Sequence, residues 1–227
     1  MSLGARIKKV MTTASPVGVT FKRFGRDHDG GYVMVDDLTS NDFLISMGIA
    51  NDVSFEQDLS ALIKGSHMYD FSISNLPSTV PNGSLFREKV GADSRHIFSK
   101  VRPGTDIILK VDIEGSEWEL FRRLPSSDLL RCRQIVMEIH WAIVNPYISA
   151  PNMPVEVLEK LSDTHQLVVA HPNNYGSIVM VDGVRVPQVI ELTWLRRESY
   201  TFLNEQPDVV RFQMPNNPLA KEIEDIF

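Results

Sequence analysis

The sequence predicts an α/β protein with a mainly parallel sheet, because short apolar runs alternate with amphipathic stretches along most of the chain. Its 227 residues are 43% hydrophobic and 23% charged, which is typical of a globular domain large enough to bury a substantial core. No apolar run approaches the roughly 18 residues that span a membrane, and Cys132 is the single cysteine. These observations favour one cytoplasmic domain in a reducing compartment, with neither a disulfide nor a membrane segment.

The N-terminal part is predicted to be a cover segment over residues 1–38, followed by the main domain over residues 39–227. Residues 1–15 contain basic side chains without an apolar stretch behind them, so we expect a short helix or a tail and no signal peptide. Residues 30–35 have the sequence Gly-Gly-Tyr-Val-Met-Val. They predict a small β element that covers one end of the sheet.

The strands of the main sheet are predicted from short apolar runs. They are residues 43–47, 67–71, 107–111, 134–139 and 166–170. Residues 178–181 and 186–194 flank Asp182-Gly183, a dipeptide typical of tight hairpins. We therefore expect an antiparallel hairpin at one edge of the sheet.

Helices are predicted between these strands, from apolar residues that recur on one helical face. Residues 54–64 form the first, a second follows Ser116, and residues 155–161 form a third. Gln57 and Glu119 each lie three residues after a Ser at the start of the first two helices. This spacing is the pattern of a capping box.

Polar residues and one glycine turn follow the strands at their carboxyl ends. In an open α/β sheet, ligands bind beyond these ends, near the point where the strand order reverses. The residues concerned are Ser46, Gly48, Asn51, Asp70, Asp112, Glu114, Glu138, His140, His171 and Asn173. We expect the ligand site among them.

Gly48 and Asp70 each allow a structural and a functional interpretation. Gly48 permits either a tight turn from strand to helix or the close approach of a ligand, with the N–H groups of a helix behind it. The turn lacks the G-x-G-x-x-G pattern of a dinucleotide site. Asp70, about 20 residues further on, is either a solvated carboxylate or an acceptor for a ribose diol. Gly30 and Gly31 likewise serve a bend, or belong to a loop that closes over a ligand.

Asp112, Glu138 and His140 are the candidates for chemistry. Negative charge concentrated at one place costs stability unless a cation or a hydrogen-bond donor answers it. These groups can bind a hard metal ion or act as a general base, or they form a network that holds the strand ends together. The net charge of −6 argues against nucleic acid as a partner. Residues 142–154 follow this strand without a regular period and predict a substrate loop.

Three blocks of the sequence carry a more specific signal. They are residues 23–33, which contain Asp-Gly-Gly-Tyr, residues 46–56 around the glycine turn, and residues 109–119, which are Leu-Lys-Val-Asp-Ile-Glu-Gly-Ser-Glu-Trp-Glu. With the strand at residues 134–140, they resemble the FkbM-type branch of class I S-adenosylmethionine (SAM) methyltransferases over about residues 20–175. The resemblance implies a Rossmann-like three-layer sandwich with a seven-stranded, mostly parallel sheet whose last strand is antiparallel. The main domain would then be the SAM-binding methyltransferase domain.

The resemblance also implies roles for single residues. The residues expected to bind the cofactor are Gly30, Gly31, Ser46, Gly48, Asn51, Asp70, Asp93 and Asp112. Asp70 would take the ribose hydroxyls, Asp93, after a strand at residues 85–90, would lie near the adenine, and Asp112 would lie beside the methionine end and the acceptor. The turn has one glycine where many SAM enzymes have more. Asn51 would therefore adopt the backbone conformation that glycine usually supplies.

The expected function is SAM-dependent methylation of a hydroxyl on a small molecule or a saccharide. Because SAM carries an activated methyl group, the protein has to align the acceptor, exclude water and remove the hydroxyl proton. Asp112, Glu138 and His140 are the expected catalytic residues, either as a base or as ligands of a cation such as Mg²⁺. Two alternatives stay open: a SAM- or nucleotide-binding module without catalysis, and a metal-dependent hydrolase that uses the same three residues. A homodimer also stays open. Neither a nucleic acid nor a membrane is expected as a partner.

Overall fold

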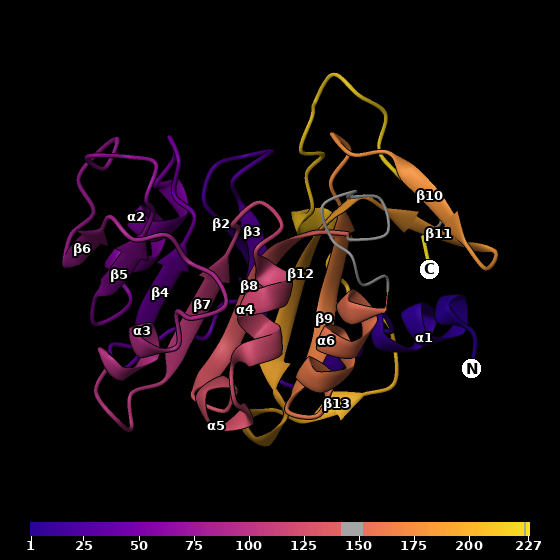
Figure 1. Cartoon of the computed structure of the whole chain (residues 1–227), viewed down its shortest axis with the longest axis horizontal. Coiled ribbons are helices and arrows are strands. Elements are labelled where there is room, and N and C mark those ends of the chain that lie inside the picture. The colour runs from indigo at the N-terminus through magenta and orange to yellow at the C-terminus, as the bar shows by residue number, and fades with distance from the viewer. Residues whose placement is uncertain (142–151, 225) are drawn as a thin grey trace.

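The computed structural model describes residues 1–141, 152–224 and 226–227. At its centre is a sheet of seven strands in the order β6-β5-β4-β7-β8-β12-β9 (Figure 1). The strands are β4 (Phe43–Met47), β5 (Ser66–Tyr69), β6 (Gly83–Phe86), β7 (Ile107–Val111), β8 (Cys132–His140), β9 (His165–Pro172) and β12 (Val189–Arg196). The strands from β6 to β8 are parallel, whereas β12 is antiparallel to both of its neighbours. The predicted α/β class, with a mostly parallel sheet and one antiparallel strand, is confirmed.

The order of the strands reverses between β4 and β7. After β4 the chain adds β5 and β6 on one side, and it then returns to add β7 and β8 on the other. Loops that leave the two sides of such a switch point diverge and leave a crevice between them. Gly48 and Asp112 follow β4 and β7 directly. The topology therefore brings the glycine turn and a candidate catalytic residue to the same crevice.

Strand β12 lies inside the sheet, between β8 and β9, and not at its edge as the sequence predicted. Pairing on both sides buries the six central residues of β12. The predicted hairpin forms a separate sheet from β10 (Ile178–Val181) and β11 (Val184–Pro187). Asp182 and Gly183 make its turn with positive φ angles of 49° and 82°, as a type I′ turn requires. The turn is a local signal, whereas the place of β12 depends on long-range pairing.

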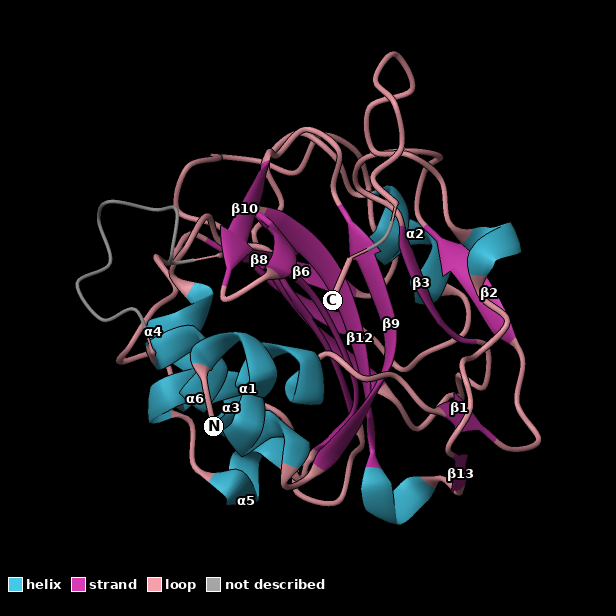
Figure 2. Ribbon diagram, turned by 90° about the vertical axis from the view of Figure 1, so that its right-hand side faces the viewer, coloured by secondary structure: helices cyan, strands magenta, loops and turns pink. Residues whose placement is uncertain are grey.

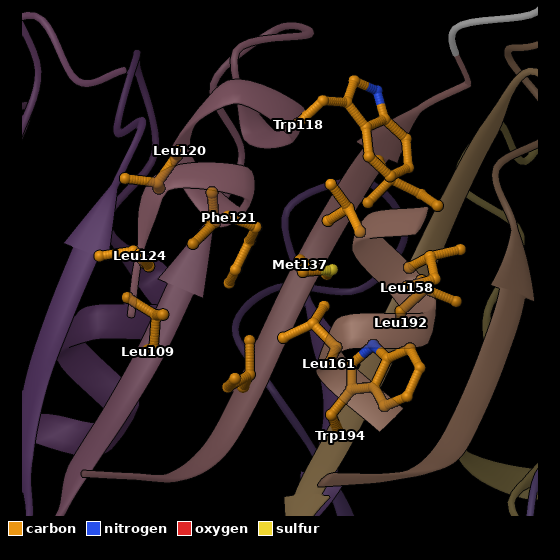
Figure 3. Packing of buried hydrophobic residues seen from close by; sticks show 14 of the residues in the cluster. Leu109, Trp118, Leu120, Phe121, Leu124, Met137, Leu158, Leu161, Leu192 and Trp194 are labelled. Carbon is orange, nitrogen blue, oxygen red and sulfur yellow. The ribbon is translucent and has the colours of Figure 1, made fainter. Parts of the chain in front are cut away.

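One face of the sheet is covered by helices. They are α1 (Leu3–Val10), α3 (His96–Ser99), α4 (Glu117–Arg123), α5 (Ser126–Leu129) and α6 (Met153–Ser162) (Figure 2). Beneath them lies the main core, in which Trp118 and Phe121 of α4 and Leu161 of α6 pack in one cluster with Met137 and Trp194 of the sheet (Figure 3). Helix α1 is the short helix expected within residues 1–15. In the part of the chain that the structure describes, no helix has the length and apolarity needed to cross a bilayer.

The opposite face is covered by helix α2 (Ser54–Ser60) and by the antiparallel strands β2 (Phe21–Phe24) and β3 (Tyr32–Val35). Tyr32 and Met34 pack with residues of β4, β7 and β8, whereas Val33 and Val35 pack with residues of β9 and β12. The N-terminal β element therefore lies over a face of the sheet, which corrects the prediction that it covers one end. Strands β1 (Ser15–Pro16) and β13 (Phe202–Leu203) form a further pair, and two 3₁₀ helices, at Arg197–Ser199 and Val210–Phe212, lie on either side of β13 in the chain.

The first N–H groups of α2 and α4 are not satisfied by the predicted capping boxes. Before α2, Asp52 Oδ1 accepts from Ser54 N at 3.1 Å, and the Gln57 side chain bonds to a neighbouring loop instead. At α4, the Ser116 side chain makes no capping hydrogen bond, and Glu117 Oε1 accepts from Ile113 N, in the loop before the helix, at 2.9 Å. Several local partners can satisfy the first turn of a helix, so the spacing alone does not choose among them.

Candidate active site

A cavity of about 480 Å³ opens at the carboxyl ends of the parallel strands, at the switch point between β4 and β7. Its size falls in the range of small-molecule sites. The walls come from the loop before β3, the loops after β4, β5, β6 and β7, and the end of β8. The lining includes seven residues that the sequence placed at the expected site: Gly30, Gly48, Asn51, Asp70, Asp112, Glu114 and Glu138.

Three residues that were expected to bind the cofactor lie outside this lining. Ser46 is fully buried in β4, and its hydroxyl donates to Glu56 Oε1 at 2.5 Å. Gly31 makes the bend before β3, where a Cβ atom would come within 2.1 Å of Arg26 O. Asp93 is exposed in a neighbouring hollow of about 800 Å³ that follows β6. Ser46 and Gly31 thus support the walls from behind, and Asp93 lies to one side.

The glycine turn depends on Gly48. Its φ is 81°, and a Cβ atom there would lie 1.6 Å from the backbone oxygen of Asp112. Only glycine lets the turn lie against the end of β7, and Lys110 Nζ holds it there by donating to Gly48 O at 2.6 Å. A second positive φ, of 50°, occurs at Ala50 and not at Asn51, which corrects the prediction. An alanine in this conformation stores about 1–2 kcal/mol of strain.

The loop before β3 lies directly on the glycine turn. Arg26 Nε is 3.3 Å from Asp52 Oδ2, and Arg26 N donates to Ser54 Oγ at 2.9 Å. A Cβ atom at Gly30, whose φ is 91°, would lie 2.7 Å from Asp52 Oδ2. The Asp-Gly-Gly-Tyr run therefore forms a wall of the cavity as well as a bend.

The Asp70 side chain accepts hydrogen bonds from the turn after β4 and from its own loop after β5. Its Oδ2 accepts from Ile49 N at 2.9 Å and from Ala50 N at 2.8 Å. Its Oδ1 accepts from Ser72 N at 2.7 Å and from Ser72 Oγ at 2.6 Å. Burial opposes ionisation, but these donors stabilise the carboxylate and lower the pKa of Asp70 to about 2. Asp70 is therefore ionised at neutral pH, and its hydrogen bonds to Ile49 and Ala50 fix the shape of the glycine turn.

Asp112 and Glu138 form an acidic corner at the other end of the cavity. The Tyr32 hydroxyl donates to Asp112 Oδ2 at 3.1 Å, and Asn173 Nδ2 donates to Glu138 Oε2 at 2.8 Å. Burial, together with the carboxylates of Asp112 and Glu191, raises the pKa of Glu138 well above its ordinary value. Burial and the same carboxylates also raise the pKa of Tyr32, so its hydroxyl remains a donor.

His140 lies at the end of β8 among three carboxylates, outside the cavity lining. Its Nε2 is 3.3 Å from Glu114 Oε2 and 3.6 Å from Glu138 Oε1, and its Nδ1 is 3.4 Å from Glu117 Oε1. Burial alone would lower the pKa of His140, but the acids around it raise the value to about 9. At neutral pH His140 is therefore an imidazolium that balances part of the acidic corner.

One group in the described residues has the spacing of a metal site. It consists of Asp112, Glu114 and His140, whose ligand atoms lie within 4.8 Å of one another. Glu138, which the sequence placed in the metal set, is not part of this group. Carboxylates suit a hard cation such as Mg²⁺, but the imidazole would have to release its proton before it could bind a metal.

Three further residues contribute to the site, although the sequence does not predict a role for them. Tyr32 belongs to a block that resembles the family, but its pattern predicts only a β element. Lys110 lies within the predicted apolar strand at residues 107–111, and its charge there is the only signal in the sequence for a role. Glu191 lies opposite Glu138 in the β8–β12 pair, and an acid within an otherwise apolar strand was the only signal for it. The predicted substrate loop at residues 142–154 falls mostly on residues 142–151, which lie outside the described part of the chain.

Comparison with known proteins identifies the family. Residues 31–166 match the model of the methyltransferase FkbM domain, whereas no curated protein sequence gives a significant match. An rRNA methylase from Streptococcus thermophilus is 11% identical, with a TM-score of 0.45 over 70% of this chain and 89% of that chain. The 23S rRNA methyltransferase ErmE is 9% identical, with a TM-score of 0.44 over 71% of this chain and 64% of that chain. A putative methyltransferase from Streptococcus mutans, in complex with S-adenosylhomocysteine (SAH), is 12% identical, with a TM-score of 0.37 over 70% and 89%.

The matched residues cover more than half of the chain and include the glycine turn, Asp70, Asp112 and Glu138. The chain therefore belongs to the FkbM methyltransferase-domain family, for which SAM is the implied methyl donor.

Proposed function

We propose that this chain is an O-methyltransferase, which transfers the methyl group of SAM to a hydroxyl of a small molecule or a saccharide. One observation carries the proposal: a single cavity is lined both by the turn at Gly48 and by the carboxyl group of Glu138. Glu138 is 8% exposed, and its pKa is raised by burial and by neighbouring carboxylates. A raised pKa makes the ionised carboxylate a stronger base. Glu138 is therefore suited to take the proton of a hydroxyl acceptor.

The residues of the cavity divide the work. Bound SAM supplies a methyl group on a positively charged sulfur, which is already activated for transfer. Gly48 lets the turn after β4 approach the end of β7, and Asp70 fixes that turn. Asp112 is held by the Tyr32 hydroxyl and adds negative charge beside the acceptor end of the cavity. Glu138 takes the hydroxyl proton as the acceptor oxygen gains its methyl group.

The protonation of His140 supports this assignment of the base. With a pKa of about 9, the imidazole already carries both of its protons at neutral pH. It therefore has no lone pair with which to accept a further proton. Its positive charge lies 3.6 Å from Glu138 Oε1, where it favours the ionised form of that carboxyl. We assign His140 the role of positioning residue for Glu138.

The charges of the cavity favour a neutral, hydroxylated acceptor. The acidic lining residues are Asp29, Asp52, Glu56, Asp70, Glu88, Asp112, Glu114 and Glu138, and the cationic ones are Arg26, Lys89 and Lys110. Negative charge prevails and repels phosphates, which disfavours nucleic acid and anionic lipid surfaces as substrates. Hydroxyl groups, in contrast, donate readily to carboxylates. This balance supports a saccharide or another small hydroxylated molecule.

Transfer from methyl-labelled SAM tests the proposal. The protein is incubated with labelled SAM and a panel of hydroxylated small molecules and saccharides, and the expected product is an alkali-stable methyl ether. Glu138→Gln should lower turnover by about 10²- to 10⁴-fold, because the base is lost, while its affinity for SAH stays near that of the wild type. Glu198→Gln, at an exposed acid far from the cavity, is the matched control. Full turnover by Glu138→Gln, or label found only on amines or carboxyl groups, would contradict the proposal.

A cation-assisted version of the same reaction is supported by the spacing of Asp112, Glu114 and His140. A divalent ion there would lower the pKa of an acceptor hydroxyl and reduce the need for a base. Thermal unfolding with Mg²⁺ or Mn²⁺, with and without SAH, tests it. A bound ion at 100 times its Kd adds about 2.7 kcal/mol of stability, and Glu114→Gln should remove that gain. If neither cation shifts the transition, the version with Glu138 alone stands.

A further inference from the structure

The Asp70 carboxylate has a donor at each of its acceptor positions. A carboxylate offers about four lone-pair sites, two on each oxygen. Oδ2 is filled by the backbone N–H groups of Ile49 and Ala50, and Oδ1 by the N–H and the hydroxyl of Ser72. Yet the carboxylate lines the cavity and lies beside the glycine turn. A hydroxylated ligand can therefore reach Asp70 only by replacing one of these donors.

The four donors differ in how easily they can leave. The N–H groups of Ile49 and Ala50 belong to the glycine turn, so their loss would require the turn itself to move. The Ser72 N–H belongs to the backbone of the loop after β5, so its loss would require that loop to move. The Ser72 hydroxyl is different, because it rotates about one side-chain bond. Ser72 is exposed and lines the cavity, so its hydroxyl finds water as a new partner once it turns away.

We propose that the Ser72 hydroxyl is a placeholder, which holds Asp70 Oδ1 in the ligand-free protein and is displaced by a ribose hydroxyl of the cofactor. Oδ2 remains bonded to the glycine turn throughout, so one carboxylate shapes the turn and binds the ribose at the same time. Ser72 is then a residue that sets cofactor affinity and specificity for the ribose hydroxyls. The inference rests on the proposed function only in requiring that SAM or SAH binds in this cavity.

The exchange has a measurable consequence. In the wild type, the ribose gains a bond to Oδ1 only after the Ser72 hydroxyl has given one up, so the net gain is small. In Ser72→Ala, the Oδ1 position is free before binding, and the ribose gains the contact without that competition. A net hydrogen bond is worth about 0.5–1.5 kcal/mol. The affinity for SAH is therefore expected to rise by about 2- to 10-fold.

Calorimetric titration with SAH and with its 2′-deoxy and 3′-deoxy analogues tests the exchange. Ser72→Ala should bind SAH more tightly by the factor given above. The analogue that lacks the displacing hydroxyl should bind Ser72→Ala and the wild type equally, so the preference for SAH over that analogue increases. Ser74→Ala is the matched control, because Ser74 is exposed in the same loop and lies outside the cavity lining. Its affinities should equal those of the wild type for all three ligands.

Two other outcomes overturn the inference, and they differ in what else they overturn. If the wild type binds SAH but Ser72→Ala shows the same or a lower affinity, with an unchanged preference over both analogues, the exchange is wrong and the proposed function stands. If the wild type binds no SAH, both the exchange and the proposed function are wrong. The wild-type titration alone separates these cases.

Discussion

The two ends of strand β8 both bury charged groups, but the amino end pairs carboxylates with a guanidinium, whereas the carboxyl end gathers more carboxyls than its neutral donors and the imidazolium of His140 can balance. Near the amino end, Arg133 contacts Asp42 twice, with Nε–Oδ1 at 3.1 Å and Nη2–Oδ2 at 2.7 Å. Its Nη1 donates to Asp37 Oδ1 and to Tyr200 Oη, both at 2.7 Å. The side chain of Arg133 is 10% exposed and that of Asp42 is 1% exposed. A bidentate pair of this kind keeps buried charge fully bonded.

At the carboxyl end, burial and the carboxylate of Asp112 raise the pKa of both Glu138 and Glu191. The side-chain amides of Asn173 and Asn216 donate to these two glutamates at 2.8 Å and 2.6 Å. Within the part of the chain that the structure describes, none of the three acids forms an ion pair with a lysine or an arginine. Apart from His140 beside Glu138, the described residues supply these acids with no such ion-pair partner, and positive charge from a ligand would find partners here.

The comparison shows two kinds of buried charge: charged groups that pair with each other within the fold, and carboxyl groups that remain available to bind a ligand. The amino end is complete, because each buried donor and acceptor of the Arg133 cluster has a partner within the chain. The carboxyl end carries an excess of carboxyls, which a proton, a cation or a sulfonium can satisfy. Proteins commonly accept such unfavourable local arrangements at functional sites and compensate for them elsewhere.

The largest expected effect follows from removing the guanidinium of the Arg133 cluster near the amino end of β8. Arg133→Met leaves Asp42 buried without its partner, and the loss of one member of a buried ion pair costs about 3–5 kcal/mol. The free energy of unfolding, measured with urea, should fall by this amount. Arg123→Met, on the exposed side of α4, is the control and should stay within about 0.5 kcal/mol of the wild type. A loss of less than about 1 kcal/mol in Arg133→Met would show that the pair contributes little to stability.

An effect with the opposite sign is expected from Glu191→Gln. Burial dominates the shift that raises the pKa of Glu191 to about 8 in the folded protein, while its ordinary value is near 4.5. The folded state thus holds a proton that the unfolded state releases, and wild-type stability should fall as pH rises from about 4.5 to about 8. One such carboxyl contributes at most about 1.4 kcal/mol per pH unit in this window. Glu191→Gln removes this contribution, so the variant should exceed the wild type most clearly near pH 8.

Urea unfolding at pH 5, 6, 7 and 8 measures this difference. Glu205→Gln, at an exposed acid, serves as the control and should follow the wild-type curve. The free energy of unfolding of the variant should still fall somewhat with pH, because His140 also binds a proton more tightly in the folded state. Its pKa is about 9, so the stability that its proton contributes is lost as pH rises through that value. Parallel curves for Glu191→Gln and the wild type would mean that Glu191 ionises normally, and the contrast between the two ends of β8 would then rest on Glu138 alone.

The sequence could predict most of the residues at the carboxyl edge of the sheet, because they follow strands that are recognisable by themselves. Gly48, Asp70 and Asp112 each come directly after an apolar run, and parallel strands bring such positions to one edge of a sheet. Glu138 lies near the carboxyl end of a strand that the same pattern predicts. Position along the chain was therefore enough to place these residues in one cavity.

The parts that could not be predicted depend on contacts between distant segments. Glu191 reaches the acidic corner because β12 inserts between β8 and β9, which places it opposite Glu138. Asn216 comes from the C-terminal segment and has no neighbouring signal in the sequence. The Arg133 cluster at the amino end of β8 could not be predicted for the same reason, since Arg133 and Asp42 are 91 residues apart in the chain. Hydrophobic periodicity reports which residues are buried, but not which buried charges meet.

The smallest expected effect tests whether the edge of the sheet that lines the cavity also tolerates backbone strain, in the turn after β4. Ala50 has a φ of 50°, and its N–H is held on Asp70 Oδ2 at 2.8 Å. Ala50→Gly removes the strain, partly offset by the greater freedom of glycine in the unfolded chain, and should stabilise the protein by about 0.5–1 kcal/mol. The same change at Ala61, whose φ is −80°, has no strain to relieve and should destabilise by about 0.5–1 kcal/mol. If both variants lose stability equally in urea unfolding, the glycine turn stores no strain, and the compromise at the carboxyl end is one of charge alone.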